Sequence, residues 1–242
     1  MFKHLSEQRP EVLDDRAFLM VITEMELEAR TTGPLNLCLF AVMAALHPDE
    51  MRYVQNEIDR VVGRSRLPTF DDQSSLPYLH AFMTESQRLY PLVPLSFARF
   101  RIPADAIIVP NQWAINMDAA TYPNPKSFQP QRWLDNPSLP LPGTFGYGRR
   151  MCSGRHLANT GLFIAMASMA WAFEFADKTP GLSVETGLVR SMLFCPQTSG
   201  VGVSLRSDAH GAVIKREREA MDTDMSLHLN EIGLVLGNKT SV

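Results

Sequence analysis

Apolar residues recur at helical spacing over the N-terminal part of the chain. Residues 35–46 form an almost uninterrupted apolar run, and residues 49–63 and 76–91 each place apolar side chains on one stripe. Positions three and four apart share one face of a helix, so these segments predict helices that bury one side. Gly33 and Pro34 precede the apolar run. Because proline lacks a backbone donor, we expect the helix to kink or restart there.

The spacing of apolar residues changes in the second half of the chain. Residues 99–117 are rich in β-branched and aromatic residues and predict a short hairpin. Residues 118–151 have no sustained period, but aromatic residues interrupt them, so we expect an ordered loop rather than a disordered linker. A long helix is predicted over about 153–175, short strands near 188–206, and a charged helical patch at 214–221.

Composition excludes several classes of protein. The 242 residues include 23 Lys and Arg against 26 Asp and Glu, so nucleic acid is not an expected partner. Three cysteines, Cys38, Cys152 and Cys195, lie far apart without a CxxC pair, which argues against a disulfide scaffold and a cysteine-rich zinc site. The apolar runs 35–46 and 161–173 are shorter than the ~18–20 residues of a spanning helix. We therefore expect no transmembrane segment in this chain.

The segment FGYGRRMCSGRH, residues 145–156, sets one cysteine among glycines and arginines. We expect it to bring Cys152 to the start of the following helix, where backbone N–H groups and the positive helix end favour a thiolate. Gly148 and Gly154 allow the backbone to lie against a flat group, and Arg150 can present a planar cationic fork to a carboxylate. A thiolate, a flat neighbour and carboxylates describe haem with its propionates.

Three other interpretations of Cys152 stay open on the residues alone. Most lone cysteines are inert and pack in the core or in a turn. A zinc half-site formed by Cys152 and His156 lacks two further ligands at a usual spacing. A nucleophilic cysteine would need a base, and His156 on the same helical turn is poorly placed for that role.

The same segment resembles the cysteine-ligand signature FxxGxRxCxG of the cytochrome P-450 haem-thiolate monooxygenases. The matching positions are Phe145, Gly148, Arg150, Cys152 and Gly154. In the order typical of that family, residues 85–88 (ESQR) resemble its ExxR helix and residues 128–133 (FQPQRW) resemble its FxPERF segment, with Gln131 in place of the usual Glu. The resemblance implies that Cys152 ligates the haem iron and that the other four signature residues surround the cofactor.

The resemblance further implies an ion cluster behind the haem, formed by Glu85, Arg88 and Arg132. Taken alone, Glu85 and Arg88 could equally be a solvated i,i+3 pair worth a few tenths of a kcal/mol. The implied fold is mainly α with small β-hairpins, the C-terminal half of the cytochrome P-450 fold. It would comprise a truncated haem-binding domain over residues 1–206 and a partly helical or disordered tail over 207–242.

The implied reaction inserts one oxygen atom of dioxygen into an organic, hydrophobic substrate of the secondary-metabolite type. Electrons would come from NADPH through an NADPH-cytochrome reductase. The family implies a place on the cytoplasmic side of the endoplasmic reticulum, or in the cytoplasm for a chain without an anchor. The sequences of residues 47–63 and of the segment near 204–219 are similar to those of fungal members of the family.

One segment departs from the family in a way that affects catalysis. The oxygen-activating helix of the family carries an acid followed by threonine, whereas this chain reads Thr31-Thr32. Thr32 is therefore the candidate catalytic residue, and an ordinary polar role near a helix start is an equal alternative for it. The departure keeps two other functions open: a non-catalytic truncated remnant, and a haem-thiolate isomerase or dehydratase that needs no oxygen helix.

Overall fold

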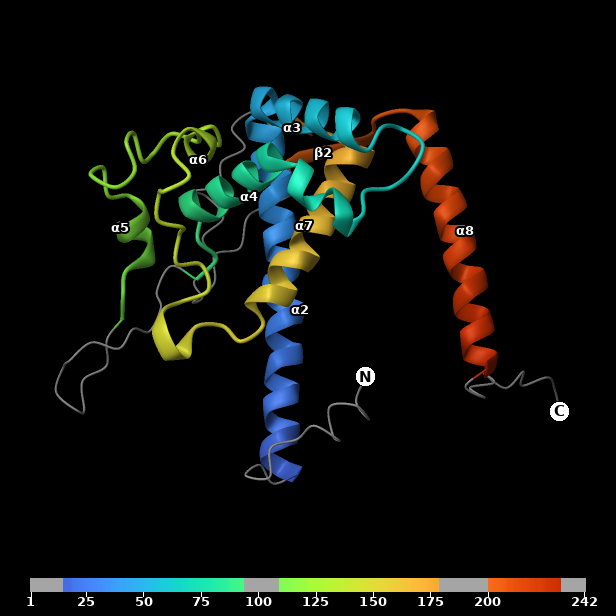
Figure 1. Ribbon diagram of the computed structural model, residues 1–242, viewed down its shortest axis with the longest axis horizontal. Helices are drawn as coiled ribbons and strands as arrows, with labels where there is room; N and C mark the ends of the chain where they lie inside the picture. Colours follow the sequence, from blue (N-terminus) through green and yellow to red (C-terminus); the bar gives the residue numbers. More distant parts are fainter. Residues whose placement is uncertain (1–14, 94–108, 179–199, 232–242) are drawn as a thin grey trace.

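The computed structural model describes the backbone of residues 15–93, 109–178 and 200–231, and these ranges are mostly helical (Figure 1). The helices of the first range are α2 (Asp15–Leu46), α3 (Pro48–Val61), the 3₁₀ helix η1 (Phe70–Ser75) and α4 (Pro77–Leu89). Those of the second are α5 (Gln112–Asn116), α6 (Arg132–Asp135), the 3₁₀ helix η2 (Gly148–Arg150) and α7 (Arg155–Ala172). Strands β1 (Phe173–Asp177) and β2 (Val201–Leu205) and helix α8 (Asp208–Glu231) follow.

The core lies where α2, α3, α4 and α7 meet, and Figure 1 shows α3 and α4 crossing one end of α2 beside α7. Aromatic rings from different helices fill it. The ring of Phe40 on α2 lies edge-on to Phe82 on α4, with centroids 5.4 Å apart, and Phe82 contacts Phe128 of the loop in the same way at 5.0 Å. The stripes read from the sequence are therefore the buried faces of these helices.

Helix α2 continues through Pro34, so the restart expected at Gly33-Pro34 is wrong, whereas the kink stays a prediction. A proline inside a helix removes one hydrogen bond and costs about 3 kcal/mol. Residues 39–45, which begin five positions after Pro34, are buried in the core apart from partly buried Ala41. The side-chain amide of Asn36 also donates to the Thr32 carbonyl oxygen at 3.0 Å. Tertiary packing of the helix thus outweighs the local cost.

The segment expected to form a hairpin, residues 99–117, is different where it is described. Residues 94–108 lie outside the described residues, and residues 112–116 form the short helix α5 rather than a strand. The Asn111 side chain caps α5 by accepting from the Ala114 amide at 3.0 Å. The Asn111 N-cap favours a helix at this point, and the periodicity of apolar residues gives no signal of a cap. The following loop is ordered as expected and contains only the short helices α6 and η2 within 118–151.

Helix α7 ends at Ala172, three residues before the predicted end, because the chain continues as β1. Strand β1 pairs antiparallel with β2, with Phe173 opposite Leu205 and Asp177 opposite Val201. Of the strands predicted near 188–206, residues 201–205 form β2, and 179–199 lie outside the described residues. Phe175 of β1 is buried beside Phe40 of α2, at a centroid distance of 6.1 Å, so the sheet packs on the helical core.

Helix α8 is much longer than the charged patch predicted at 214–221. Its first turns pack on the core through His210 and Val213, and the rest of its backbone extends away from the other elements in Figure 1. Arg206 just before it forms an ion pair with Asp59 of α3 at 2.8 Å. The expected fold class, mainly α with a small antiparallel sheet, is confirmed, whereas the division at residue 206 stays a prediction. In the described ranges, none of the helices combines the length and apolarity needed to cross a bilayer.

Candidate functional site

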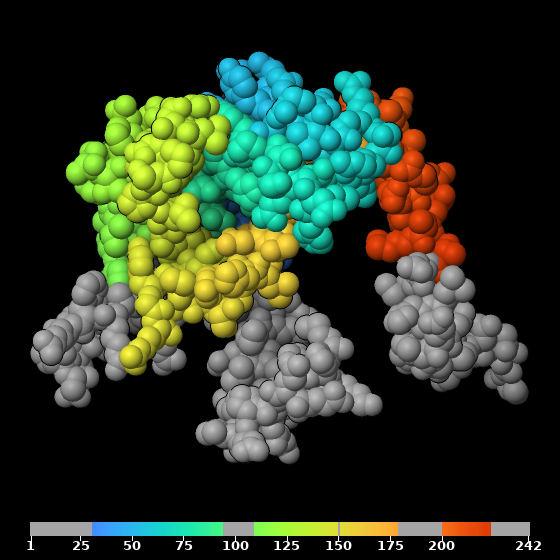
Figure 2. Space-filling model, viewed as in Figure 1, coloured from blue at the N-terminus to red at the C-terminus, as the bar shows by residue number. Residues whose placement is uncertain are grey.

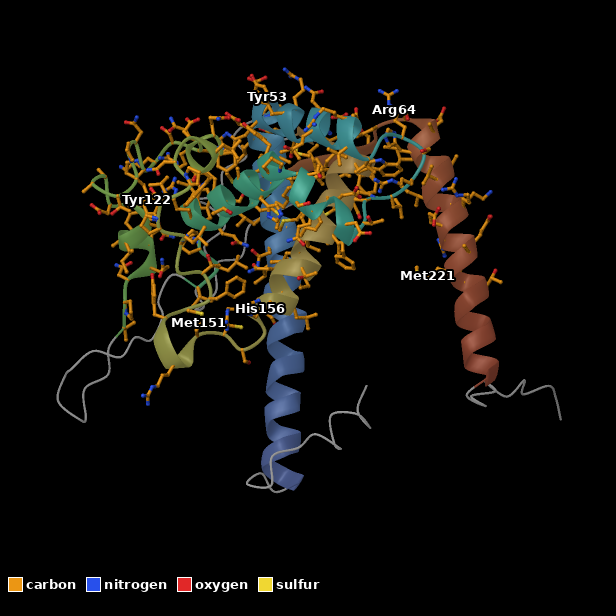
Figure 3. All side chains as sticks on the ribbon, in the orientation of Figure 1. Tyr53, Arg64, Tyr122, Met151, His156 and Met221 are labelled. Carbon is orange, nitrogen blue, oxygen red and sulfur yellow. The ribbon has the colours of Figure 1, made fainter. Side chains whose placement is uncertain are left out.

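The cysteine loop, residues 145–154, doubles back on itself before α7 begins. The Cys152 amide donates to the Phe145 carbonyl oxygen at 2.9 Å, which closes a ring of eight residues. Within this ring, the Met151 amide donates to the Gly148 carbonyl oxygen at 3.2 Å and forms η2. Figure 3 shows Met151 and His156 near the start of α7, and Figure 2 shows the yellow segment at the molecular surface. The Cys152 side chain is half-buried, so its thiol is held by the loop yet accessible.

Helix α7 begins at Arg155 with Gly154 as its N-cap, two residues later than the Ser153 start expected from the sequence. Cys152 therefore lies just before the helix, and its own amide is engaged by Phe145. The expected helix start at Ser153 is therefore corrected to Arg155. The loop needs the intervening residues to turn from the closed ring into the helix axis.

Glycine at position 148 serves both the backbone and the surface of this site. Its φ of +63° lies in the left-handed region, where residues with a Cβ are strained. A Cβ built on Gly148 would meet no atom of the described chain within 4 Å, so the space beside the loop is open. A Cβ on Gly154 would lie 3.9 Å from Cys152 Sγ. The loop thus presents a thiol next to an open, glycine-lined surface.

The donor set around Cys152 distinguishes among possible metal centres. Across the described ranges, no three His, Cys, Asp or Glu side chains are grouped so that they could hold an ion. The zinc half-site with exposed His156 therefore gains no further ligand from this part of the chain. A single thiolate suits a metal that brings its own in-plane ligands, as haem iron does. The site therefore fits haem through its ligand and its open surface, while the side chain of Arg150 lies outside the described part of the structure.

Glu85, Arg88 and Arg132 lie together in the structure as a buried ion cluster. Glu85 and Arg88, one turn apart on α4, are both 0% exposed, and Arg132 of α6 is 8% exposed. Glu85 Oε1 accepts from Arg88 Nη2 at 2.8 Å and from Arg132 Nε at 3.1 Å, and Oε2 accepts from Arg88 Nε at 2.9 Å. The pair is thus not the solvated i,i+3 pair that remained the alternative.

Additional donors complete the coordination of the Glu85 carboxylate. The indole Nε1 of Trp133 donates to Oε2 at 3.0 Å, and the Gln129 amide donates to Oε1 at 3.0 Å. The arginines also bind backbone carbonyl groups of α5 and of the loop that follows it. Arg88 Nη1 donates to the Asn116 oxygen at 2.8 Å, and Arg132 Nη1 to the Pro123 oxygen at 2.7 Å. The cluster therefore fastens the long loop to α4.

An aromatic ring lies next to the same cluster. The guanidinium carbon of Arg88 is 5.3 Å from the centroid of the Tyr122 ring, within the range of a cation–π contact. Tyr122 is buried, and its hydroxyl donates to the Pro140 oxygen at 2.7 Å. Burial raises the pKa of the Tyr122 phenol, although the positive charge of Arg88 opposes this shift. Tyr122 is therefore a buried, uncharged side chain that packs against the ion cluster.

Thr32, the candidate catalytic residue, lies half-buried in the regular part of α2, and Thr31 beside it is exposed. The Thr32 carbonyl oxygen accepts from the Asn36 side chain. The helix is continuous at this point. The catalytic role of Thr32 stays a prediction.

Sequence reasoning missed four residues that belong to this region: Gln112, Asn116, Trp133 and Tyr147. Gln112 and Asn116 are fully buried, although they lie in a segment read as a strand. Their four-residue spacing on one helix face would have been the available signal, once the N-cap at Asn111 was recognised. Trp133 and Tyr147 stand inside recognised motifs, but their polar atoms were not considered.

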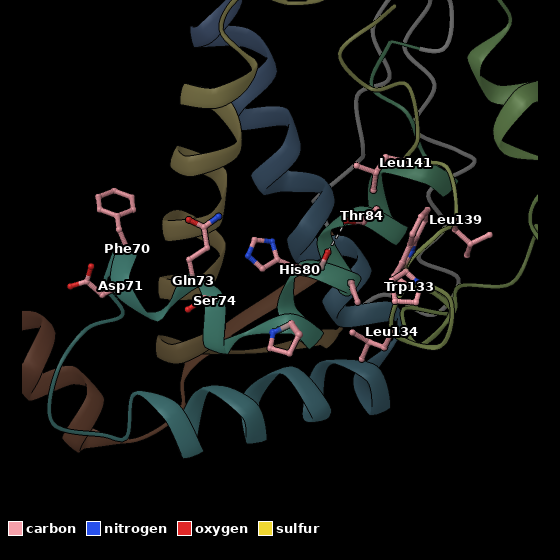
Figure 4. A pocket seen from close by; sticks show the side chains of 13 residues that line it. Phe70, Asp71, Gln73, Ser74, His80, Thr84, Trp133, Leu134, Leu139 and Leu141 are labelled. Carbon is pink, nitrogen blue, oxygen red and sulfur yellow. Dashed lines mark hydrogen bonds between the residues drawn. The ribbon is translucent and has the colours of Figure 1, made fainter.

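A surface groove of about 600 Å³ lies on the side of α4 that faces η1 and α6 (Figure 4). His80 lies between Phe70 of η1 and Trp133 of α6 in this view. Burial lowers the pKa of His80, whose ring stacks on Phe163 at a centroid distance of 5.1 Å. No residue of the cysteine loop lines this groove, so it is separate from the candidate cofactor site.

Comparisons with known proteins relate this chain to one family. A profile of the family described as Cytochrome P450 matches residues 2–197. The chain is 35% identical, over 90% of its length, to the cytochrome P450 monooxygenase FrzL of a Cladobotryum species, and 38% identical, over 70%, to fumitremorgin C synthase of Aspergillus fumigatus. It covers 45% and 34% of these two proteins, and so spans less than half the length of either.

Among solved structures, a zebra fish cytochrome P450 with progesterone superposes on this chain with a TM-score of 0.71 and 26% sequence identity. The superposition covers 82% of this chain and 48% of that one. A second zebra fish cytochrome P450 structure, with abiraterone, gives a TM-score of 0.64 and 28% identity, over 73% of this chain and 45% of that one. The described fold is therefore shared with part of these structures.

Proposed function

Because the chain belongs to the cytochrome P450 family, we propose that it forms the cysteine-ligand part of a haem-thiolate monooxygenase. In the proposed reaction, dioxygen takes up two electrons and two protons. One oxygen atom enters a C–H bond of an organic substrate as a hydroxyl group, and the other leaves as water. NADPH supplies the electrons through a reductase and is oxidised to NADP⁺.

The observation that carries this proposal is the closed cysteine loop, which holds Cys152 just before α7 next to an open space at Gly148. In the proposal, Cys152 would supply the thiolate ligand of the haem iron, and Phe145, Gly148 and Gly154 would shape the surface that receives the cofactor. Arg150 is the proposed partner of a propionate. When bound, haem supplies a thiolate-ligated iron at which dioxygen is reduced and one oxygen atom is transferred.

The protein's own residues hold the ligand in place rather than take part in bond cleavage. The hydrogen bond from the Cys152 amide to the Phe145 carbonyl oxygen sets the position of the thiol. The open space beside Gly148 leaves room for a flat group next to the loop. Separately, the ion cluster holds the end of α5 and the long loop that follows it against α4, through bonds from Arg88 to the Asn116 oxygen and from Arg132 to the Pro123 oxygen. Thr32 is the proposed distal hydrogen-bond donor, since a hydroxyl both donates and accepts.

The test of this proposal is the ligand itself. The full chain is supplied with haem, reduced and treated with carbon monoxide, and the Soret band is recorded. Thiolate ligation by Cys152 gives the long-wavelength band, and Cys152→Ala or Cys152→His abolishes it. Cys38→Ala removes the other described cysteine, which is also half-buried, and is the matched control. Persistence of the band in a Cys152 variant would refute the assignment.

The substrate and redox partner are proposed at the level of class. A hydrophobic secondary metabolite is the proposed substrate, because the fungal relatives include an enzyme named fumitremorgin C synthase. The reductase is proposed to dock near exposed Arg149 and partly buried Arg155, which flank the cysteine loop and present positive charge. The proposed location is the cytoplasmic face of the endoplasmic reticulum, where such reductases operate in the family.

The Thr31-Thr32 pair favours a second candidate function. A threonine in place of the acid cannot relay protons as a carboxylate does. A haem-thiolate isomerase or dehydratase would need no such relay, and a non-catalytic remnant would need none either. Product formed without dioxygen and NADPH would indicate the isomerase or dehydratase. Haem binding without turnover of any kind would indicate the remnant.

A further inference from the structure

A line of hydrogen bonds joins the cysteine loop to the helix that carries the ion cluster. The Tyr147 hydroxyl donates to Gln112 Oε1 at 2.6 Å, and Gln112 Nε2 donates to Asn116 Oδ1 at 2.7 Å. Asn116 Nδ2 then donates to the Arg88 carbonyl oxygen at 2.8 Å. The two amide side chains are 0% exposed. Each donor in this line has one acceptor, so all three hydrogen bonds are donated in the same direction, from Tyr147 towards the Arg88 backbone.

Asn116 is held by Arg88 from two directions. Its side chain donates to the Arg88 backbone, while its own carbonyl oxygen accepts from Arg88 Nη1 at 2.8 Å. The same guanidinium group binds Glu85 through Nε and Nη2. The position of α5 is therefore tied directly to the arginine at the centre of the ion cluster.

The other end of the line lies within the ring that contains the thiol. Tyr147 belongs to residues 145–152, the ring closed by the bond from the Cys152 amide to the Phe145 carbonyl oxygen. Tyr147 ties this ring to α5 through Gln112. A change in the position of Tyr147 must therefore move the ring, and with it Cys152, relative to α4.

The backbone at Gly143 independently supports a fixed position for Tyr147. A Cβ built on Gly143 would collide with the Tyr147 hydroxyl and lie only 2.7 Å from Gln112 Oε1. Residue 143 thus has to be glycine for the tyrosine and the glutamine to meet. Such a close approach of backbone to a side-chain hydrogen bond marks a specific contact rather than general packing.

We infer that Tyr147, Gln112 and Asn116 form a positioning relay that sets the place of the Cys152 thiol with respect to the ion cluster. This inference rests on the proposed function, since the thiol is positioned for haem. The three residues act through Cys152 and do not contact the cofactor themselves. Loss of the Tyr147 hydroxyl leaves the buried Gln112 Oε1 without its donor. We expect this loss to raise the equilibrium constant for local opening of the cysteine loop by roughly tenfold.

The experiment compares the haem-loaded full chain with Tyr147→Phe, which removes only the hydroxyl. Tyr53→Phe is the matched control, because Tyr53 on α3 is 61% exposed. The reduced, carbon-monoxide-treated proteins are compared at equal haem content. We expect Tyr147→Phe to convert from the long-wavelength to the shorter-wavelength Soret band about tenfold faster than the parent. Tyr53→Phe converts at the parental rate.

A second variant separates the relay from local packing. Gln112→Met removes both amide links while keeping a side chain of similar length. In that background, Tyr147→Phe has no hydrogen bond left to lose and adds no further acceleration. Equal conversion rates for Tyr147→Phe and the parent, or full additivity of the two substitutions, would overturn the inference.

Amide exchange decides the inference even if haem does not bind. In the haem-free chain, Tyr147→Phe raises the hydrogen-exchange rate of the Cys152 amide about tenfold, and amides of α3 are unchanged. A parent chain without the long-wavelength band refutes the proposed function, and the relay is then judged by this exchange rate. An unchanged Cys152 amide in that case refutes the relay as well.

Discussion

Replacing Glu85 by alanine removes the carboxylate at the centre of the ion cluster. Glu85 is fully buried on α4, and its two oxygens accept five hydrogen bonds. Two of these come from Arg88, and the other three come from Arg132, Trp133 and Gln129. Alanine leaves all five donors without this acceptor and leaves two guanidinium charges without their anion.

The magnitude follows from the burial of the partners. Breaking a buried ion pair by removing one member costs about 3–5 kcal/mol, because the remaining charge is uncompensated. Both arginines keep hydrogen bonds to carbonyl oxygens of the loop, which limits the loss. We therefore expect Glu85→Ala to lower the free energy of unfolding by about 3–5 kcal/mol. That loss is a large share of the ~5–15 kcal/mol that stabilises a typical domain.

The assay is equilibrium urea unfolding of the full chain, followed by far-ultraviolet circular dichroism. Glu219→Ala is the matched control, since Glu219 also lies on a helix but pairs with Lys215 at 4.0 Å with both side chains exposed. The control should change the free energy of unfolding by less than about 0.5 kcal/mol. The reasoning is refuted if Glu85→Ala and Glu219→Ala have the same midpoint and the same denaturant slope.

A milder substitution keeps the prediction measurable if Glu85→Ala does not fold. Trp133→Phe removes the indole N–H bond to Glu85 Oε2 and retains an aromatic ring. The expected loss is about 1–2 kcal/mol, because one of several donors to a charged acceptor is deleted. A parental free energy of unfolding for Trp133→Phe would show that this donor contributes nothing to the cluster.

Two further predictions concern the pH dependence of stability. Burial, together with the positive charge of Arg206, lowers the pKa of His210 below its usual value near 6.5. The folded state therefore disfavours the protonated imidazole. The contribution of neutral His210 to the free energy of unfolding is fully present above about pH 6.5 and is lost as the pH falls towards the folded pKa. In urea titrations at several pH values, His210→Gln should flatten the dependence of the free energy of unfolding on pH in this range. Asp72 accepts two 2.7 Å bonds from Arg66, which holds the pKa of Asp72 at about 2. The contribution of ionised Asp72 to the free energy of unfolding is present above about pH 4 and is lost between about pH 4 and 2. Asp72→Asn should lower the free energy of unfolding by about 1–2 kcal/mol at neutral pH and remove this loss at acid pH. The same decrease in stability between about pH 4 and 2 in Asp72→Asn and in the parent would contradict this prediction.

The main helices could be predicted from the spacing of apolar residues alone. The apolar stripes of α3 and α4 follow helical spacing, and such spacing is a local property that survives in any packing. The order of the three motifs carried the resemblance to the family. It also singled out Glu85, Arg88 and Arg132, which the structure brings together although Arg132 lies on a different helix.

The elements that depend on distant partners could not be predicted from local spacing. Residues 173–175 have a helical continuation available, yet they form β1 because residues 201–205 pair with them. Pro34 does not break α2, since burial of the residues that follow offsets the lost hydrogen bond. In both cases local propensity is a matter of about 1–3 kcal/mol, and packing against remote segments outweighs it.

The relay from the cysteine loop shows the same limit most clearly. Tyr147 and Gln112 are 35 positions apart, and no spacing rule relates a hydroxyl in a loop to a side-chain amide on a distant helix. The sequence determined that a thiol would be presented before a helix by a glycine-rich loop. Where that thiol lies relative to the ion cluster depends on buried hydrogen bonds between side chains, and these form only when the chain has folded and excluded water.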